Sequence, residues 1–275
     1  MYRESSIHYP QDEMTTMMIP VTLGCPYNKC LFCTMYKDDK YSEVPLEQIR
    51  QQLINGYEYT EKVFLTGADP LCVGYDKMMI ILKEIREYLP YCARVASYAS
   101  VRSISRYSDE ELSNLHNSGL RLLYIGFEAG SDKYLSLMNK GHTVSDAIRE
   151  AKKLNKVNLA FNAIVLIGIG GAGRCKENAQ KTVHMINQFH AKTLITMSLM
   201  LMEGSGLSEL AKKGEYIPSS RQENLLETWT ILHNLHPEKT MEFDTTHPSN
   251  IIKIKGILPQ DRKRLLMEID SKIQE

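Results

Sequence analysis

The feature that most constrains this chain is a cysteine-rich loop near its start, GCPYNKCLFC at positions 24–33. It holds three of the six cysteines, Cys25, Cys30 and Cys33, in the spacing C-x4-C-x2-C. Three soft thiolates on one short segment are suited to a soft metal centre. Closed zinc sites and ordinary iron–sulfur electron carriers use four protein ligands. A cubane cluster on this loop would therefore keep one iron open to another ligand.

Length and charge limit what the rest of the chain can be. The chain has 275 residues, enough for one large core or two modest ones. Lys plus Arg and Asp plus Glu both number 33, so the formal net charge is zero. That balance argues against a broad phosphate-binding surface, and we do not expect a nucleic-acid partner.

The sequence shows neither a membrane-spanning segment nor a signal peptide, which bears on where we expect the protein to be located. No apolar run approaches membrane-spanning length, and the polar start at positions 1–6 does not look like a signal peptide. The remaining cysteines, Cys72, Cys92 and Cys175, are scattered singly. We therefore expect a cytoplasmic protein without a membrane partner and without a disulfide framework.

Apolar runs of strand length alternate with amphipathic segments through most of the chain. The predicted strands are 16–23, 62–66, 94–98, 122–127, 160–167 and 193–201. Because parallel neighbours need crossover connections, this alternation predicts a parallel α/β sheet. Six βα units are too few for a closed eight-stranded barrel, so we expect a partial (β/α)6 TIM-like barrel. Unusual residues recur after four of these strands, on the face where such folds bind ligands.

The pattern changes after the sixth predicted strand. Two helices are expected at 207–213 and 219–235, then an irregular stretch at 243–250. A short strand at 251–254 and a last helix at 260–273 end the chain. We therefore divide the sequence into a barrel core, 1–203, and a helical C-terminal extension, 204–275, that packs on the barrel or closes it.

Four motifs together resemble the radical S-adenosylmethionine (radical SAM) superfamily. They are the cysteine loop with Phe32 before its last cysteine, GADP at 67–70, IGFEAGS at 125–131 and MNKGHT at 138–143. The last two resemble the branch of coproporphyrinogen dehydrogenases and methylthiotransferases. Two departures stand out: the common loop of the family is C-x3-C-x2-C, and the family usually has Gly-Gly-Glu-Pro where this chain has GADP.

The resemblance implies an enzyme with two cofactors. Cys25, Cys30 and Cys33 would hold a [4Fe–4S] cluster, and S-adenosylmethionine (SAM) would chelate the open iron. One electron from the cluster would cleave SAM to methionine and a 5′-deoxyadenosyl radical, which abstracts hydrogen from a substrate or adds to it. The resemblance also implies anaerobic chemistry and an electron donor such as flavodoxin or ferredoxin.

It also implies which residues would contact SAM. Phe32 would lie near adenine, and the backbone of Gly67, Ala68 and Asp69 would meet the ammonium group. The other expected contacts are Glu128 with the ribose or methionine part, Lys140 or Arg102 with the carboxylate, Asn162 with a ribose hydroxyl and Gly168 with adenine. Each also has an ordinary reading, as a core aromatic, a turn, a solvated lysine or a buried amide.

Several functions stay open at this stage. The neutral charge favours a small-molecule substrate, while the branch also contains enzymes that modify RNA, and a peptide is a further option. A second class of function is a nicotinamide-dependent oxidoreductase with a structural metal, because Gly168–Gly173 matches G-x-G-x-x-G. That fingerprint also needs an acidic residue about twenty positions on, at the end of the next strand, but the segment 192–196 has none and the next acid after it is Glu203. A third is a non-catalytic scaffold with zinc on the cysteines and a distant ligand such as His8.

Two single residues are tempting but weak. Cys72 follows the GADP motif and could donate hydrogen to a substrate radical, although a lone cysteine is more often a small buried hydrophobe. His247 in the irregular stretch could donate a proton.

Overall fold

The computed structural model describes residues 8–275, which form two compact units. Unit 1 consists of residues 8–28, 35–125 and 153–161, and unit 2 of residues 29–34, 126–152 and 162–275. The boundary predicted after residue 203 falls inside unit 2 and stays a prediction. In the part of the chain that is described, no helix has both the length and the apolar character needed to cross a bilayer.

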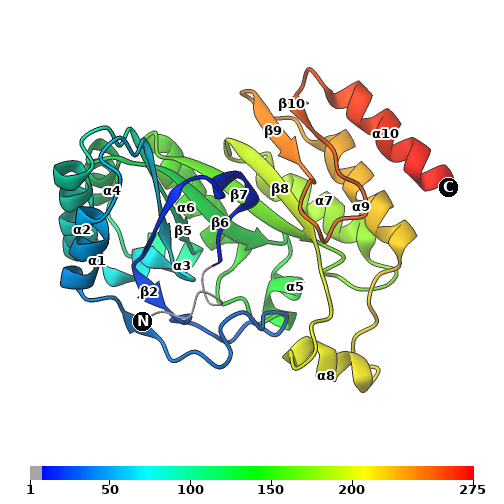
Figure 1. The fold of residues 1–275 in the computed structure, drawn as a ribbon. Helices are drawn as coiled ribbons and strands as arrows, with labels where there is room; N and C mark the ends of the chain where they lie inside the picture. The colour runs from blue at the N-terminus through cyan, green and yellow to red at the C-terminus, as the bar shows by residue number, and fades with distance from the viewer. Residues whose placement is uncertain (1–7) are drawn as a thin grey trace. The chain divides into compact units, whose positions relative to one another are not determined.

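Unit 1 contains a parallel sheet in the order β1-β4-β5-β6. The strands are β1 (Met17–Pro20), β4 (Lys62–Thr66), β5 (Arg94–Ala99) and β6 (Leu120–Glu128), whose last residues belong to unit 2. The crossovers are helical: α1 (Leu46–Ile54), α2 (Tyr75–Tyr88) and α4 (Asp109–Asn117). These three helices lie side by side along the strands (Figure 1). This arrangement confirms the βα alternation predicted for the first half of the chain.

The first predicted strand is interrupted. It divides into β1 and β2 (Thr22–Leu23), and β2 pairs antiparallel with β3 (Ser42–Glu43). Short helical segments also follow two strands, η3 (Pro70–Val73) after β4 and α3 (Val101–Ile104) after β5. The short helix η2 (Gln11–Glu13) precedes β1. The chain therefore leaves the sheet before the cysteine loop begins.

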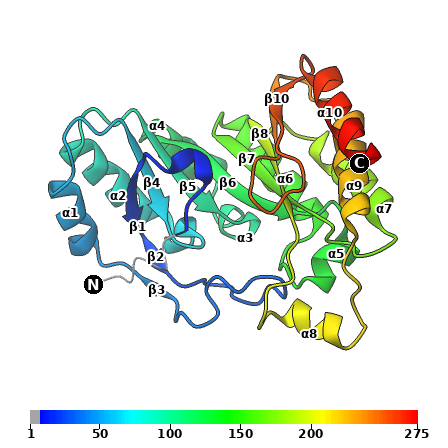
Figure 2. The same cartoon turned by 45° about the vertical axis from the view of Figure 1, so that its right-hand side comes forward.

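Unit 2 continues the same architecture with β7 (Ala160–Ile167), β8 (Thr193–Ser198) and β9 (Met241–Asp244), which are parallel, and β10 (Lys255–Leu258), which is antiparallel to β9. Its helices are α5 (Asp132–Leu137), α6 (Val144–Lys156, which ends in unit 1), α7 (Cys175–Ile186), α8 (Gly206–Lys212), α9 (Arg221–Asn234) and α10 (Arg262–Gln274). Figure 2 shows α7, α9 and α10 packed together on one side of these strands.

The C-terminal extension is more than helical. It supplies β9 and β10, where the sequence predicted an irregular stretch and a strand at 251–254. The 251–254 segment is instead held as a loop, because the Thr245 hydroxyl donates to the Ile252 carbonyl at 2.7 Å and accepts from the Ile254 amide at 2.9 Å. In the described chain β1 and β10 each pair with only one strand of the sheet. The mostly parallel α/β sheet is therefore not closed, as predicted.

Local sequence signals explain where helices begin and break. Ser108 and Glu111 form a reciprocal capping box at the start of α4, as their spacing predicts. The helical region predicted from 132 to 154 breaks between α5 and α6, where Asn139 and Gly141 take left-handed backbone conformations with φ of 51° and 80°. Few residues besides Gly and Asn adopt that conformation readily, so the residue types at 139 and 141 explain why the helix breaks here.

Candidate functional site

The first half of the cysteine loop is fixed by contacts within unit 1. Cys25 is half-buried and is separated from the end of β2 by Gly24 alone. Asn28 is left-handed with φ of 45°, and its side-chain amide donates to the Tyr36 carbonyl at 2.8 Å. The guanidinium of Arg102 lies 4.2 Å above the centre of the Tyr27 ring, a cation–π contact. Arg102, predicted to bind the SAM carboxylate, thus contacts the cysteine loop itself.

The second half of the loop is fixed by contacts within unit 2. The Leu31 amide donates to the Met138 carbonyl at 2.9 Å, and the Asn139 side chain donates to the Lys29 carbonyl at 3.1 Å. On the other side, the Leu207 amide donates to the Leu31 carbonyl at 2.9 Å. The MNKGHT motif therefore positions this half of the loop through its backbone and Asn139. The motif indicated that this segment is functional, but the sequence does not show that Met138 and Asn139 contact the cysteine loop.

The donor set of the loop fits an iron–sulfur cluster. Cys25, Cys30 and Cys33 are all half-buried, and none of them is in a disulfide. Within residues 8–275, no three His, Cys, Asp or Glu side chains are gathered so that they could hold a metal ion. The fit therefore rests on chemistry: three soft thiols on a segment held by protein hydrogen bonds. The assignment of these cysteines as ligands stays a prediction.

Three predicted SAM-contacting residues come together beside the second half of the loop. The Lys140 ammonium forms an ion pair with the Glu128 carboxylate at 2.6 Å and lies 5.9 Å from the centre of the Phe32 ring. The side chains of Lys140 and Glu128 are 16% and 8% exposed. Space for the pair exists because residue 126 is glycine: a Cβ there would lie 2.3 Å from Glu128 Oε1.

The charge of this pair is set by its surroundings. Burial lowers the pKa of Lys140, but the Glu128 carboxylate and negative charge on the Cys30 and Cys33 sulfurs raise it, and the net direction is upward. Lys140 is therefore a cation at neutral pH. A cation beside Phe32 and next to the cysteine loop suits the carboxylate of an amino-acid ligand.

Asp69 is used to build the protein. Its carboxylate accepts hydrogen bonds from the Ser100 amide at 3.2 Å, the Ser100 hydroxyl at 2.6 Å and the Ser103 hydroxyl at 2.7 Å. These bonds attach the turn after β4 to the start of α3, the short helix that carries Arg102. The carboxylate is thus committed to the fold, and the predicted cofactor contacts at 67–69 would come from the backbone. Sequence reasoning missed Ser100 and Ser103.

Gly67 is required by both conformation and space. Its φ is 126°, and a Cβ added there would lie 2.2 Å from Thr22 Oγ1 and 2.7 Å from the Thr22 carbonyl oxygen. Real Cβ atoms do not approach other atoms so closely, so a side chain at this position would push β2 and the end of β4 apart. The turn predicted to meet the cofactor is therefore packed directly against the strand that leads into the cysteine loop.

Asn162 is not brought to the carboxyl end of its strand. It is the third residue of β7, opposite Thr193 of β8. Ile167, the last residue of the strand, lies five positions further on, which corresponds to about 16 Å along a strand. Its Oδ1 is buried and has no hydrogen-bond partner in the described part of the chain. The ribose contact stays a prediction, but the position of Asn162 within β7 agrees better with the alternative reading, a buried amide.

The Gly168 turn is covered by the chain itself. The Gly168 amide donates to Glu227 Oε2 at 3.1 Å, and its carbonyl accepts from the Tyr216 hydroxyl at 2.8 Å. The Gly173 amide donates to the Glu223 carboxylate. Two carboxyl groups therefore face the amides that would bind a pyrophosphate in a dinucleotide site. This geometry counts against the nicotinamide alternative and leaves the predicted adenine contact of Gly168 untested.

Glu227 is the buried member of this cluster. Burial raises its pKa to about 8, although hydrogen bonds from the Asn178 side chain and the Gly168 amide act in the opposite direction. The Asn178 bond measures 2.6 Å. Glu227 thus holds α9 to α7 and to the end of β7.

Cys72 and His247 are both half-buried and hydrogen-bonded. The Cys72 sulfur lies 3.1 Å from the Tyr41 hydroxyl, and burial raises the pKa of Cys72 to about 11, so it is a thiol at neutral pH. His247 Nδ1 lies 2.8 Å from the Ser249 hydroxyl, which accepts from the Ser198 amide at the end of β8. Burial lowers the pKa of His247. Their predicted chemical roles remain predictions.

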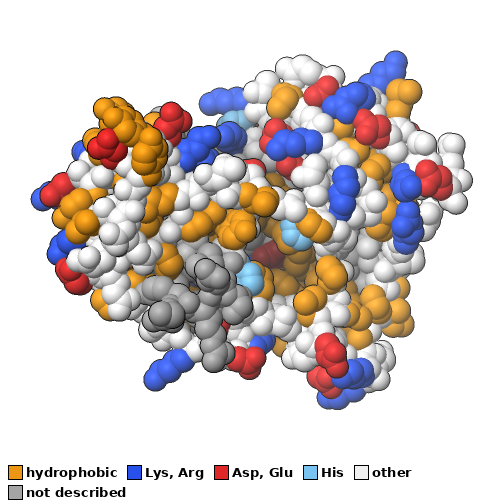
Figure 3. Space-filling view, viewed as in Figure 1, with side chains coloured by type: hydrophobic (Ala, Val, Ile, Leu, Met, Phe, Trp, Pro, Cys, Tyr) orange, Lys and Arg blue, Asp and Glu red, His pale blue; other side chains and the backbone are white. Residues whose placement is uncertain are grey.

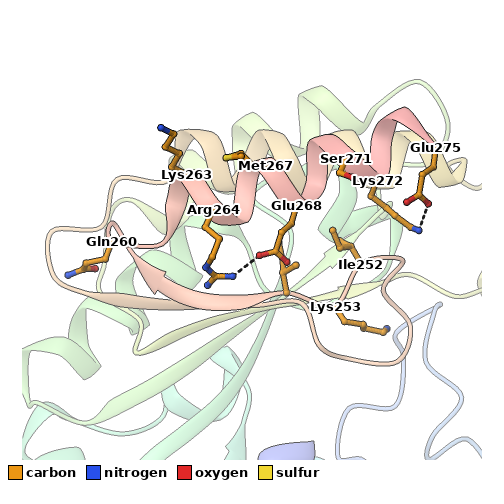
Figure 4. Close-up of a pocket in the computed structure, with 11 residues that line it drawn as sticks. Ile252, Lys253, Gln260, Lys263, Arg264, Met267, Glu268, Ser271, Lys272 and Glu275 are labelled. Atoms are coloured by element: carbon orange, nitrogen blue, oxygen red, sulfur yellow. Dashed lines mark hydrogen bonds and ion pairs between the residues drawn. The ribbon is translucent and has the colours of Figure 1, made fainter.

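A groove of about 800 Å³ lies elsewhere in unit 2, along α10 (Figure 4). Its walls are the 252–254 segment and one side of α10, and no predicted site residue lines it. Arg264 is paired with Glu268 at 2.6 Å, and Lys272 is paired with Glu275. Lys253 and Lys263 also line the groove, so it carries both signs of charge.

Comparison with known proteins identifies the family. A family model described as "Radical SAM superfamily" matches residues 19–186, which include the cysteine loop and every predicted SAM-contacting residue. The chain belongs to the radical SAM superfamily. A radical SAM protein is an enzyme, and the family implies a [4Fe–4S] cluster with one iron that has no cysteine ligand, together with SAM.

Relatives of this radical SAM enzyme support the predicted branch. It is 27% identical over 122 residues to a tRNA-2-methylthio-N(6)-dimethylallyladenosine synthase of Syntrophus aciditrophicus, which covers 44% of this chain and 26% of the synthase. It is 24% identical over 236 residues to an uncharacterized protein of Methanocaldococcus jannaschii, covering 80% of this chain and 71% of that protein. The chain thus spans about a quarter of the length of the synthase.

A solved structure confirms the fold class. The radical SAM methyltransferase of Kitasatospora setae, determined with cobalamin and a [4Fe–4S] cluster, superimposes with a TM-score of 0.59 at 19% identity. The match covers 72% of this chain and 39% of the methyltransferase. At this identity the likeness shows the fold alone, an open, partial TIM-like barrel.

Proposed function

We propose that this enzyme holds a [4Fe–4S] cluster on Cys25, Cys30 and Cys33 and cleaves SAM reductively. The cofactors would supply methionine and a 5′-deoxyadenosyl radical, which abstracts hydrogen from a substrate or adds to it. The observation that carries the proposal is the family match together with the way both halves of the cysteine loop are tied down. A flavodoxin or ferredoxin would supply the electron.

The chain's own residues would bind and orient SAM. Lys140, held as a cation beside Glu128, would pair with the carboxylate of the methionine part. Phe32 would pack against adenine, and the backbone at 67–69 would accept from the ammonium group. Asp69 would keep that turn in place through α3, and Arg102 would act on the loop through Tyr27.

For the substrate we propose a small molecule. The formal net charge is zero. On the face drawn in Figure 3, Lys and Arg side chains are interspersed with Asp and Glu, without a continuous basic field. Binding to a nucleic-acid backbone draws most of its affinity from such a field, so these observations favour a substrate that fits inside the fold.

A second candidate substrate is RNA. Its support is the name of a relative, a synthase that acts on tRNA, which matches this chain over only part of its length. Under this alternative the radical chemistry is unchanged, and the RNA would be bound by surfaces other than the face of Figure 3.

The radical chemistry is tested first without any substrate. The protein is reconstituted anaerobically with iron and sulfide and incubated with SAM and dithionite, and 5′-deoxyadenosine is quantified. We expect about four irons per chain, together with 5′-deoxyadenosine that is lost in Cys30→Ala. Cys92→Ala is the matched control, because Cys92 lies outside the loop and is expected to leave both readouts unchanged. A fully loaded protein that gives no 5′-deoxyadenosine contradicts the proposal.

The substrate class is tested by isolating the protein gently and identifying what it retains. A retained small molecule that is consumed together with SAM supports the first candidate. Retained RNA that is modified in the presence of SAM and dithionite supports the second and overturns the first.

A further inference from the structure

The loop between Cys25 and Cys30 contains a contact that the metal-binding proposal does not use. The backbone amide of Asn28 donates a hydrogen bond to the Cys25 sulfur, with an N···S distance of 3.3 Å. This bond reaches back three residues within the stretch that is one residue longer than the common C-x3-C spacing. The longer loop thus directs an amide at one of the predicted cluster ligands.

The bond depends on an unusual conformation of Asn28. Its φ of 45° lies in the left-handed region, which Asn tolerates better than most residues. The Asn28 side chain donates to the carbonyl of the buried Tyr36 at 2.8 Å. The Asn28 carbonyl accepts from the Lys37 ammonium at 3.3 Å. Next to it, Tyr27 lies under Arg102. Asn28 is therefore held on both its side chain and its backbone.

Hydrogen bonds to the sulfurs of an iron–sulfur cluster tune its reduction potential. Adding one electron to the cluster from dithionite or a reduced flavodoxin adds one negative charge, shared by its thiolate ligands. An N–H donor stabilises that added charge and so raises the potential, which eases loading of the electron and lessens the driving force for passing it to SAM.

We propose that the backbone amide of Asn28, through its N–H···S hydrogen bond to Cys25, raises the reduction potential of the cluster. The inference rests on the proposed function, because it needs a cluster on this loop. A failure of that proposal appears as missing iron, whereas a failure of this inference appears in a fully loaded protein.

The first test detects the bond in the unmodified loop. Protein labelled with 15N-asparagine is loaded, reduced and examined by HYSCORE, which detects nitrogen nuclei coupled to the cluster spin. We expect a 15N coupling in the wild-type protein that disappears in Asn28→Gly, where the amide is no longer labelled. It should persist in Asn139→Gly, because the left-handed Asn139 also anchors the loop but donates its amide to the Ser136 carbonyl.

The second test measures the potential. Asn28→Gly tolerates the left-handed conformation and keeps the amide, so its midpoint should match that of the wild-type protein. Asn28→Pro removes the donor and, because proline fixes φ at about −65°, also the left-handed conformation of residue 28; together with a 15N coupling in the wild-type protein, it should give a lower midpoint at equal iron content. Asn158→Pro, at another left-handed asparagine (φ of 56°) that lies outside the loop, is the control and should leave the midpoint unchanged. Absence of 15N coupling in the wild-type protein overturns the proposal, even if Asn28→Pro does not load a cluster; so does an unchanged midpoint in loaded Asn28→Pro.

Discussion

Removing the positive charge of Lys140 should destabilise the protein even before any cofactor binds. Lys140→Met keeps the apolar stem but leaves the Glu128 carboxylate buried without its partner at 2.6 Å. Removing one member of a fully buried pair lowers the free energy of unfolding by about 3 to 5 kcal/mol. Because both side chains keep some exposure, we expect the lower end of that range, about 3 kcal/mol. Glu128→Gln should cost less, because an amide can still accept from the ammonium.

The double variant separates the pair from its surroundings. In Glu128→Gln/Lys140→Met neither charge is left alone, so the loss should be about 2 kcal/mol smaller than the sum of the single losses. The assay is urea unfolding of the cluster-free protein, kept anaerobic with a chelator. Lys212→Met, which removes an exposed ion pair with Glu209, is the control and should not measurably change the unfolding midpoint. Strictly additive losses at 128 and 140 refute the reasoning.

Three further predictions address the turns around the site. Gly67→Ala should lower the free energy of unfolding by about 3 kcal/mol, because it combines backbone strain with overlap against Thr22. Gly204→Ala, at a φ of 76° with no atom within 4 Å, should cost clearly less in the same urea titration. Asp69→Ala should lower the free energy of unfolding by about 2 kcal/mol, because it leaves three donors at the start of α3 without their acceptor. Asp69→Glu should not restore this stability, because its longer side chain cannot reproduce the same three hydrogen bonds, and full restoration would contradict that explanation. Between pH 4.5 and about 8 the folded protein should keep a proton on Glu227 that the unfolded chain releases, so stability should fall as pH rises through this window. Unfolding of Glu227→Gln, measured across that range, should show a flatter dependence, and an unchanged slope would remove Glu227 as its cause.

Much of the fold was predictable because its signals are local. The strands at 62–66 and 160–167 are continuous apolar runs of strand length, and the structure confirms both bounds. The capping box at Ser108 and the break near Gly141 depend on residues that are neighbours in sequence. Strands β9 and β10 were misplaced because the loop between them is set by hydrogen bonds to Thr245, which the sequence pattern does not show.

The candidate site was predictable in residue type more than in contact. The sequence pointed to Glu128, Lys140 and Phe32, and the structure brings them together. The sequence could not show that the carboxylate of Asp69 accepts hydrogen bonds from Ser100 and Ser103, because these partners lie more than thirty residues away in the chain. Nor could it show that the carboxyl groups of Glu223 and Glu227, both on α9, cover the turn at 168–173. Long-range hydrogen bonds leave no periodic trace in a sequence.

The most direct test of the account is the yield of 5′-deoxyadenosine from anaerobically reconstituted protein, dithionite and SAM, measured beside its iron content. We expect a loaded cluster and formation of 5′-deoxyadenosine, both abolished in Cys25→Ala, Cys30→Ala and Cys33→Ala and both retained in Cys92→Ala. Stoichiometric zinc with no iron, or a loaded cluster that leaves SAM intact under reducing conditions, would contradict it.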